Sequence, residues 1–174
     1  INVEVATTRT YGSLEGSAPA SRTGSMTIGL NTSIVLLPET PMQRRIWDQR
    51  VGYFTNKYTI FNDEQTKTDR EEFISRLRLE PKDKRAYAKG KLTEPVKPIV
   101  FYIDPATPKK WVPYLKQGIE DWNAAFETAG FKHAIQARDW PDDPKMSVDD
   151  ARFNVLRYLP AEIENAYGPR IVDP

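Results

Sequence analysis

Few side chains in this sequence could do chemistry, and the only histidine, His133, is the first to consider. The 174-residue chain has one histidine and no cysteine. Histidine performs most acid–base catalysis near neutral pH and, with cysteine, supplies most zinc ligands. One imidazole cannot build a multi-histidine site, and the lack of thiols excludes disulfides, thiolate metal sites and a cysteine nucleophile. We interpret His133 as a turn or surface histidine, and we predict no catalytic, cofactor-binding or metal-binding residue in this chain.

A group of aspartates between residues 139 and 150 is the second candidate site. Carboxylates suit Ca²⁺, but the spacing of a calcium loop and its glycine are missing. Ser147, with Asp150 three residues later, fits a capping box and predicts one short helical turn. The group consists of Asp139, Asp142, Asp143, Asp149 and Asp150.

Two further stretches could bind ligands. The glycines within residues 12–24 lack the Gly-Lys-Ser/Thr of a phosphate-binding loop, so we interpret this stretch as a connector. Residues 51–61 are rich in aromatic side chains, among them Tyr53 and Tyr58. Stacked aromatics can bind a glycan or a base, although aromatic side chains on a sheet are more often part of the core.

The composition excludes two classes of function. Hydrophobic residues make up 39% of the chain and charged residues 28%, which is typical of a globular protein. The 25 basic and 24 acidic residues give a net charge of +1, so the basic surface of a nucleic-acid-binding protein is absent. No apolar run approaches the length of a membrane span.

A strand–helix–strand pattern organises the second half of the chain. Residues 99–103 are five apolar residues between Pro98 and Pro105, which predicts a strand covered on both faces. Residues 111–129 carry apolar side chains three or four positions apart, which predicts one helix with an apolar face. The positions on that face are Trp111, Leu115, Ile119, Trp122, Phe126 and Ala129.

The end of this helix and the strands after it follow from the next residues. Gly130 can adopt the left-handed conformation that ends a helix, and Phe131 can fold back on Phe126 as in a Schellman motif. Residues 134–138 predict a second, parallel strand. Alternation around Val155 predicts a third strand.

The first half of the chain is predicted to be rich in strands. Period-two alternation indicates strands at residues 1–11 and 26–36, and strand-forming residues indicate another at 51–61. We also predict a short helix from Thr68 or Asp69 to Ser75, and a strand at 76–79. Residues 80–97 have the composition of a linker. The prediction is therefore an α+β chain with a β-rich domain at 1–90 and a second domain at 91–174.

Several segments together resemble a known family. They are Arg50-Val-Gly-Tyr-Phe-Thr, Arg76-Leu-Arg-Leu-Glu, Glu94-Pro-Val-Lys-Pro-Ile-Val-Phe-Tyr-Ile-Asp-Pro, Glu120-Asp-Trp-Asn-Ala-Ala-Phe, Ala129-Gly-Phe, Asn154-Val-Leu-Arg-Tyr, Tyr167-Gly-Pro and Val172-Asp-Pro. In order and spacing they resemble large, metzincin-like zinc-dependent metalloproteases of bacteria, common in Bacteroidetes and described mostly through domains of unknown function. The resemblance runs along the whole chain.

The resemblance implies a fragment that lies upstream of the catalytic residues. In that family a His-Glu-x-x-His helix with a third histidine holds zinc, and its glutamate is the general base. No such motif occurs here, and His133 is not at a position of a family ligand. We therefore expect a structural piece of a secreted or periplasmic metallopeptidase, inactive alone. Zinc, the rest of the protease domain and a peptide or protein substrate would belong to the parent protein.

Two alternatives remain open at this point. The chain could be a non-catalytic binding module for a glycan or a peptide, which exposure of Trp47, Tyr53 and Tyr58 on one face would favour. Residues 1–90 could instead be a propeptide-like segment that covers the protease cleft.

Overall fold

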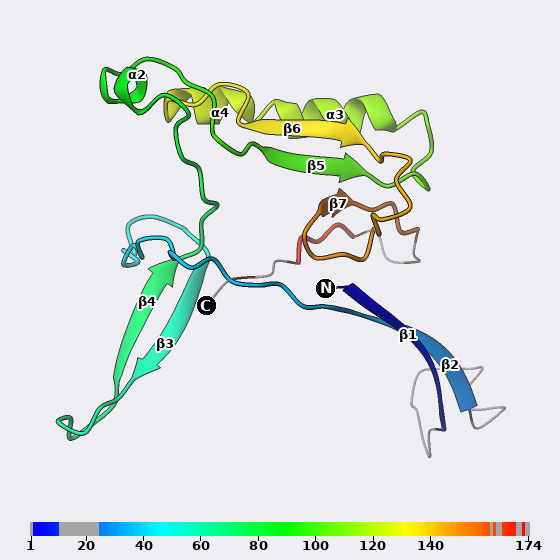
Figure 1. Cartoon of the computed structure of the whole chain (residues 1–174), viewed down its shortest axis with the longest axis horizontal. Helices are drawn as coiled ribbons and strands as arrows, with labels where there is room; N and C mark the ends of the chain where they lie inside the picture. The colour runs from blue at the N-terminus through cyan, green and yellow to red at the C-terminus, as the bar shows by residue number, and fades with distance from the viewer. Residues whose placement is uncertain (1, 11–24, 161, 163–164, 170–171, 173–174) are drawn as a thin grey trace.

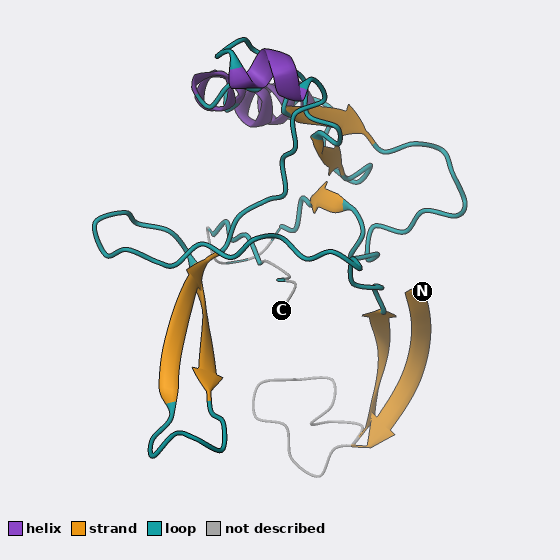
Figure 2. Cartoon of the chain, turned by 60° about the vertical axis from the view of Figure 1, so that its left-hand side comes forward, coloured by secondary structure: helices purple, strands orange, loops and turns teal. Residues whose placement is uncertain are grey.

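The computed structural model describes residues 2–10, 25–160, 162, 165–169 and 172, and it has a mixed α+β fold as expected. Two hairpins extend away from a layer of helices and parallel strands (Figure 1). Figure 2 shows the two hairpins apart from each other, both below the helical end of the molecule. The described part has no helix that is long and apolar enough to cross a membrane.

The first hairpin consists of β1 (Asn2–Thr10) and β2 (Ser25–Ser33), which pair antiparallel along their whole length. Both strands were expected from the period-two alternation, because a strand with two different faces alternates in this way. The second strand ends at Ser33, three residues earlier than predicted, and the apolar residues after it are exposed. The predicted connector at residues 12–24 lies outside the described residues.

The second hairpin consists of β3 (Thr55–Ile60) and β4 (Asp69–Ile74), also antiparallel. The short helix predicted from Thr68 or Asp69 to Ser75 was wrong, because this segment is β4. Its Phe73 is buried and packs on Tyr58 of β3, with ring centroids 5.7 Å apart. This cross-strand contact outweighs the local preference of the glutamates in the segment for a helix. The prediction of a strand at 76–79 was also wrong, because these residues form no strand.

The segment that was predicted to be a linker is folded. It contains helix α2 (Lys84–Ala88), whose first N–H groups are capped by the carboxylate of Asp83. Single β-bridges join Pro81 to Pro95, and Thr93 to Phe131. This segment is therefore attached to the second half of the chain, while the proposed boundary near residue 90 stays a prediction.

A parallel sheet of three strands carries the second half. The order is β6 (Ile135–Asp139), β5 (Ile99–Ile103) and β7 (Asn154–Leu156). All three strands were predicted. The central strand β5 pairs with both neighbours, and Ile99 and Ile103 at its ends are buried. These two isoleucines share one face of the strand because side chains alternate.

The other face of β5 meets an aromatic cluster. Tyr102 lies 5.6 Å from the ring of Trp140 and 6.0 Å from that of Phe153, and both pairs are edge-to-face. This geometry is the one that aromatic quadrupoles favour. Both faces of the strand are thus covered in part, as its unbroken apolar run predicted.

The single helix predicted at 111–129 is two shorter helices on the sheet, α3 (Val112–Glu120) and α4 (Asn123–Thr128) (Figure 1). Between them the hydrogen bonds tighten from four residues to three, with Trp122 N–H bonded to Ile119 O at 3.4 Å. Leu115, Ile119 and Phe126 are partly buried as predicted. Trp111, Trp122 and Ala129 were wrongly placed on this face, because all three are exposed, the two tryptophans by 44% and 65%.

Gly130 ends α4 as predicted. Its φ is +90°, and the Schellman pair is complete: Phe131 N–H bonds Phe126 O, and Gly130 N–H bonds Glu127 O, both at 2.9 Å. A Cβ at Gly130 would lie 2.7 Å from Cε2 of Tyr87, and the Tyr87 hydroxyl donates to Ala129 O. Tyr87 therefore fastens α2 to the end of α4.

Candidate functional site

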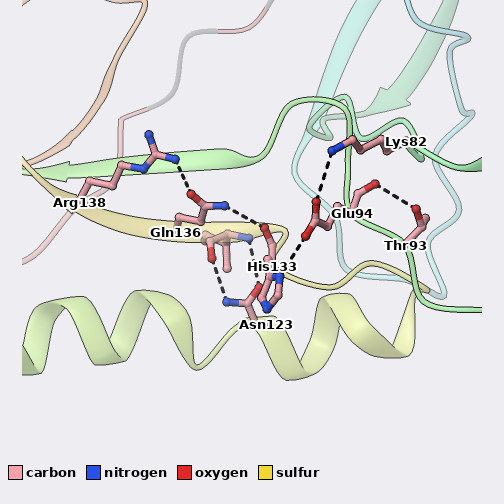
Figure 3. A network of polar contacts seen from close by, with 8 residues as sticks. Lys82, Thr93, Glu94, Asn123, His133, Gln136 and Arg138 are labelled. Carbon is pink, nitrogen blue, oxygen red and sulfur yellow. Dashed lines mark hydrogen bonds and ion pairs between the residues drawn. The ribbon is translucent and has the colours of Figure 1, made fainter.

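His133 lies in the turn between α4 and β6, where it has a φ of 52°. Few residues with a side chain adopt a positive φ, and histidine tolerates it better than branched residues do. The side chain is 69% exposed, and its Nδ1 lies 3.5 Å from Oε1 of Glu94 (Figure 3). The predicted turn histidine at the surface is confirmed, and it faces a carboxylate.

Glu94 connects this turn to the segment around α2. Its other oxygen, Oε2, lies 3.7 Å from Nζ of Lys82. The hydrogen bond from His133 and, next, the charge of Lys82 hold the pKa of Glu94 below its ordinary value. An ionised, exposed carboxylate with these partners accepts hydrogen bonds, and its ion pairs at the surface contribute little to stability. It is not suited to be a general acid.

Asn123 is the inward-facing residue of α4 that the sequence analysis missed. Its Nδ2 donates to the Ile135 carbonyl at 2.8 Å, and its Oδ1 accepts from the Ile135 N–H at 3.2 Å (Figure 3). One side chain thus satisfies both backbone groups where β6 begins. The available signal was its place in the spacing, four residues after Ile119 and three before Phe126, on the face that packs on the sheet.

The carboxyl ends of the parallel strands hold a second polar cluster. Open parallel sheets most often bind ligands at this edge. Asp104, just after β5, is buried; its Oδ1 accepts from Ala106 N–H, and its Oδ2 lies 3.5 Å from Arg157. Arg157 follows β7 and also bonds Asp149 at 2.7 Å. The carboxylates of Asp104 and Asp149 are therefore both paired with the same guanidinium group.

The turn predicted from Ser147 to Asp150 is present as a single turn, closed by a hydrogen bond from Asp150 N–H to Ser147 O at 3.1 Å and with Ser147 Oγ accepting from Asp149 N–H, but it is not helical. Asp150 is buried, and its carboxylate accepts three hydrogen bonds from the Arg152 side chain, at 3.0, 3.0 and 2.5 Å. The hydrogen bonds from Arg152 hold its pKa below the ordinary value. A backbone N–H of Arg152 also reaches Asp150, so the aspartate serves as a local cap for this turn.

The described side chains form no cluster suited to a metal ion. No three His, Asp or Glu side chains in the described ranges lie close enough together to hold a metal ion. His133 and Glu94 supply two ligand atoms, fewer than a zinc site needs, so the residues here do not fit zinc. The aspartates predicted not to form a calcium loop are divided between ion pairs and turns.

The aromatic residues proposed for a binding face do not gather on one exposed face. Tyr53 is 51% exposed, whereas Trp47 and Tyr58 are half-buried. The guanidinium of Arg44 lies 4.9 Å from the ring centroids of both Tyr58 and Phe73. Tyr58 is therefore packed between a cation and a neighbouring ring, as in a small core.

Comparison with known proteins gives one family for the first part of the chain. Residues 1–82 match the family described as Domain of unknown function (DUF5117), which covers less than half of the 174 residues. The matched range holds both hairpins and stops before α2. No curated protein and no solved structure matches this chain.

Proposed function

We propose that this chain is a structural part of a secreted or periplasmic zinc-dependent metallopeptidase and that it is inactive alone. The observation that carries the proposal is the parallel order β6–β5–β7, formed by the segments that resemble the opening of such a protease domain. The helices α3 and α4 lie on one face of this sheet (Figure 1). In this proposal the sheet supports a zinc helix and a substrate-binding strand that the rest of the parent protein provides.

The exposed apolar surface of the chain supports a role as one part of a larger fold. Among the described residues no large side chain is fully buried, and large apolar residues such as Leu36 and Phe54 are 95% and 76% exposed. Apolar surface on this scale is unusual for a protein that works alone, and it marks regions that other polypeptide covers. Among the described strands, β7 pairs on one side only, with β5, whereas the outer edge of β6 is bonded in part by the side chains of Asn123 and Glu120.

The test compares this chain with a longer polypeptide of the parent protein that continues past Pro174. We expect the longer polypeptide to bind zinc and to cleave peptides from a diverse library, and we expect a chelator to abolish cleavage. The 174-residue chain, assayed alongside, should do neither. The matched control replaces the glutamate of the expected His-Glu-x-x-His segment by glutamine, which should retain zinc and lose cleavage.

A longer polypeptide that folds but neither takes up zinc nor cleaves any peptide would contradict the proposal. It would favour the second candidate function, a non-catalytic binding module. The observation in favour of that alternative is the exposure of three aromatic side chains, Tyr53, Phe54 and Phe61, at 51%, 76% and 76%. A propeptide-like role for residues 1–90 would require that these residues inhibit the longer polypeptide when added in trans.

A further inference from the structure

The segment around Ile46 runs antiparallel to β4, the second strand of the second hairpin. Ile46 forms a bridge with Phe73 of β4, flanked by hydrogen bonds from Trp47 N–H to Glu72 O and from Ile74 N–H to Arg45 O, at 2.8 and 3.0 Å. Continuing this register away from the hairpin places residue 43 opposite residue 76, and residue 41 opposite residue 78. Near Ile46 and Phe73, the two segments are therefore paired like neighbouring strands.

Beyond the bridge, arginine side chains replace the backbone ladder. Arg76 Nη2 donates to Gln43 O at 2.7 Å, and Arg78 Nη1 donates to Thr40 O at 2.9 Å. Pro41 has no N–H to offer the opposite segment, so a regular ladder cannot continue there. A pocket of about 210 Å³ opens between the two segments. It is lined by Pro41, Met42, Gln43, Arg76, Arg78, Leu79 and Glu80.

The second of these segments has a row of unused backbone donors. Among the described residues, the N–H groups of residues 76–80 donate no hydrogen bond, and because N–H groups along a strand point alternately to its two sides, those of residues 76 and 78 face residues 41–43 in this register. The side chain of Leu77 is 59% exposed, so this segment lies at the surface of the molecule. Unpaired N–H groups along an extended edge are what an added strand from another polypeptide would pair with.

The charge around the pocket is positive and only partly neutralised. Arg78 pairs with Glu80 at 2.8 Å. Neither Arg45 nor Arg76 has a carboxylate within ion-pairing distance among the described residues. Partial burial and then the nearby charge of Arg45 lower the pKa of Arg76, as expected for adjacent cations without a counter-ion. An anion placed here would relieve this repulsion.

We propose that this pocket and the edge formed by residues 76–80 bind an extended peptide segment that carries carboxylate side chains. The backbone of the segment pairs with the free N–H groups, and a carboxylate meets the guanidinium groups of Arg45 and Arg76. A guanidinium offers paired donors that match a carboxylate. The half-buried Met42 and Leu79 suit neighbouring apolar side chains of a peptide, and a net charge of +1 does not suit a nucleic acid.

The test uses the full 174-residue chain and a short, fluorescently labelled peptide of alternating glutamate and valine, with binding followed by anisotropy. Arg45→Gln is the main variant because the Arg45 side chain makes no hydrogen bond or ion pair within the described part of the chain. We expect it to weaken binding by about tenfold, the effect of losing one charge-assisted contact. Arg50→Gln, whose guanidinium is engaged by Asp48, is the matched control and should leave binding unchanged.

Three altered probes separate the parts of the proposal. A glutamine–valine peptide should bind about tenfold more weakly because the carboxylates are lost. The acidic peptide with N-methylated backbone should also lose affinity because its backbone can no longer pair along the edge. Equal binding of either probe would overturn the proposal. Full competition by inorganic pyrophosphate at the concentration of the peptide would likewise overturn it in favour of a simple anion site, and an equal loss in Arg45→Gln and Arg50→Gln would mean diffuse attraction.

Discussion

Asn123 holds the junction between α4 and β6 with the two hydrogen bonds of one side chain to Ile135. We predict that Asn123→Ala destabilises the chain by about 1–3 kcal/mol because it leaves the partly buried N–H and C=O of Ile135 without partners. Urea unfolding followed by circular dichroism measures the change.

Trp122→Ala is the matched comparison, one position earlier on the same helical segment. Its side chain is 65% exposed, so we expect a loss below about 1 kcal/mol. The spacing of apolar residues alone leads to the opposite order, with the tryptophan as the core residue. A larger loss for Trp122→Ala than for Asn123→Ala would show that the helix lies on the sheet by another face.

The buried carboxylate of Asp150 makes stability depend on acid pH. The hydrogen bonds from Arg152 lower its pKa in the folded chain below the ordinary 3.8. A group whose pKa is lower when folded stabilises the fold at pH values above its unfolded pKa, and this contribution disappears as the pH falls through the folded pKa. Near neutral pH the contribution is complete.

We predict that Asp150→Asn lowers the free energy of unfolding at pH 7 by about 1–3 kcal/mol, since the hydrogen bonds lose their charge. The difference in the free energy of unfolding between this variant and the unsubstituted chain should shrink as the pH falls below 3.8. Urea unfolding at a series of pH values checks this. Asp142→Asn is the control, because no ion pair to Asp142 is present among the described residues, and its effect should be near zero. A difference at Asp150 that is constant with pH would contradict the prediction.

At the scale of elements, the end of α4 depends on a glycine for two separate reasons. Gly130 has φ +90°, and a Cβ there would lie 2.7 Å from Tyr87. Gly90 has φ +71° but nothing within 4 Å of a Cβ. We predict that Gly90→Ala costs about 1–2 kcal/mol for the backbone conformation alone, and that Gly130→Ala costs about 1 kcal/mol more. Thermal unfolding of both variants provides the comparison, and equal losses would mean that Tyr87 moves aside freely.

The elements that could be predicted from sequence are those whose own side chains determine them. The apolar run of β5, the alternation of β1 and the glycine that ends α4 each carry a local signal. β4 could not be predicted in this way, because its conformation comes from pairing with β3 and from burial of Phe73, both non-local. The segment around α2 was misjudged for the same reason. Its prolines and lysines give it the composition of a linker, but single β-bridges join it to residues elsewhere in the chain.

The polar contacts were even harder to predict from the sequence. His133 could be placed in a turn because it follows the end of a helix. Its contact with Glu94, which is distant in sequence, depends on the bridge between Thr93 and Phe131 that brings the two segments together. The pairing of Asp104 with Arg157 likewise requires β5 and β7 to be neighbours. Contacts between residues far apart in the chain have no local pattern to reveal them.

At the scale of the molecule, stability is distributed unevenly between the hairpins and the parallel sheet. Strand β5 is paired on both sides, and its Ile99 and Ile103 are buried. The β3–β4 hairpin has one buried apolar residue, Phe73, and two-stranded sheets are marginal by themselves. Local opening should therefore be easier in the hairpin than in the sheet.

Hydrogen exchange read by mass spectrometry tests this difference directly. We expect the amides of β5 to exchange at least about tenfold more slowly than those of β3 and β4, because β5 opens only when both neighbouring strands separate. Gly130→Ala provides a second test, because it strains the contact between α2 and the helices on the sheet. It does not affect the β3–β4 hairpin. It should speed exchange in β5 and β6 and leave β3 and β4 unchanged. Equal acceleration in all four strands would show that the hairpin and the sheet unfold as one cooperative unit.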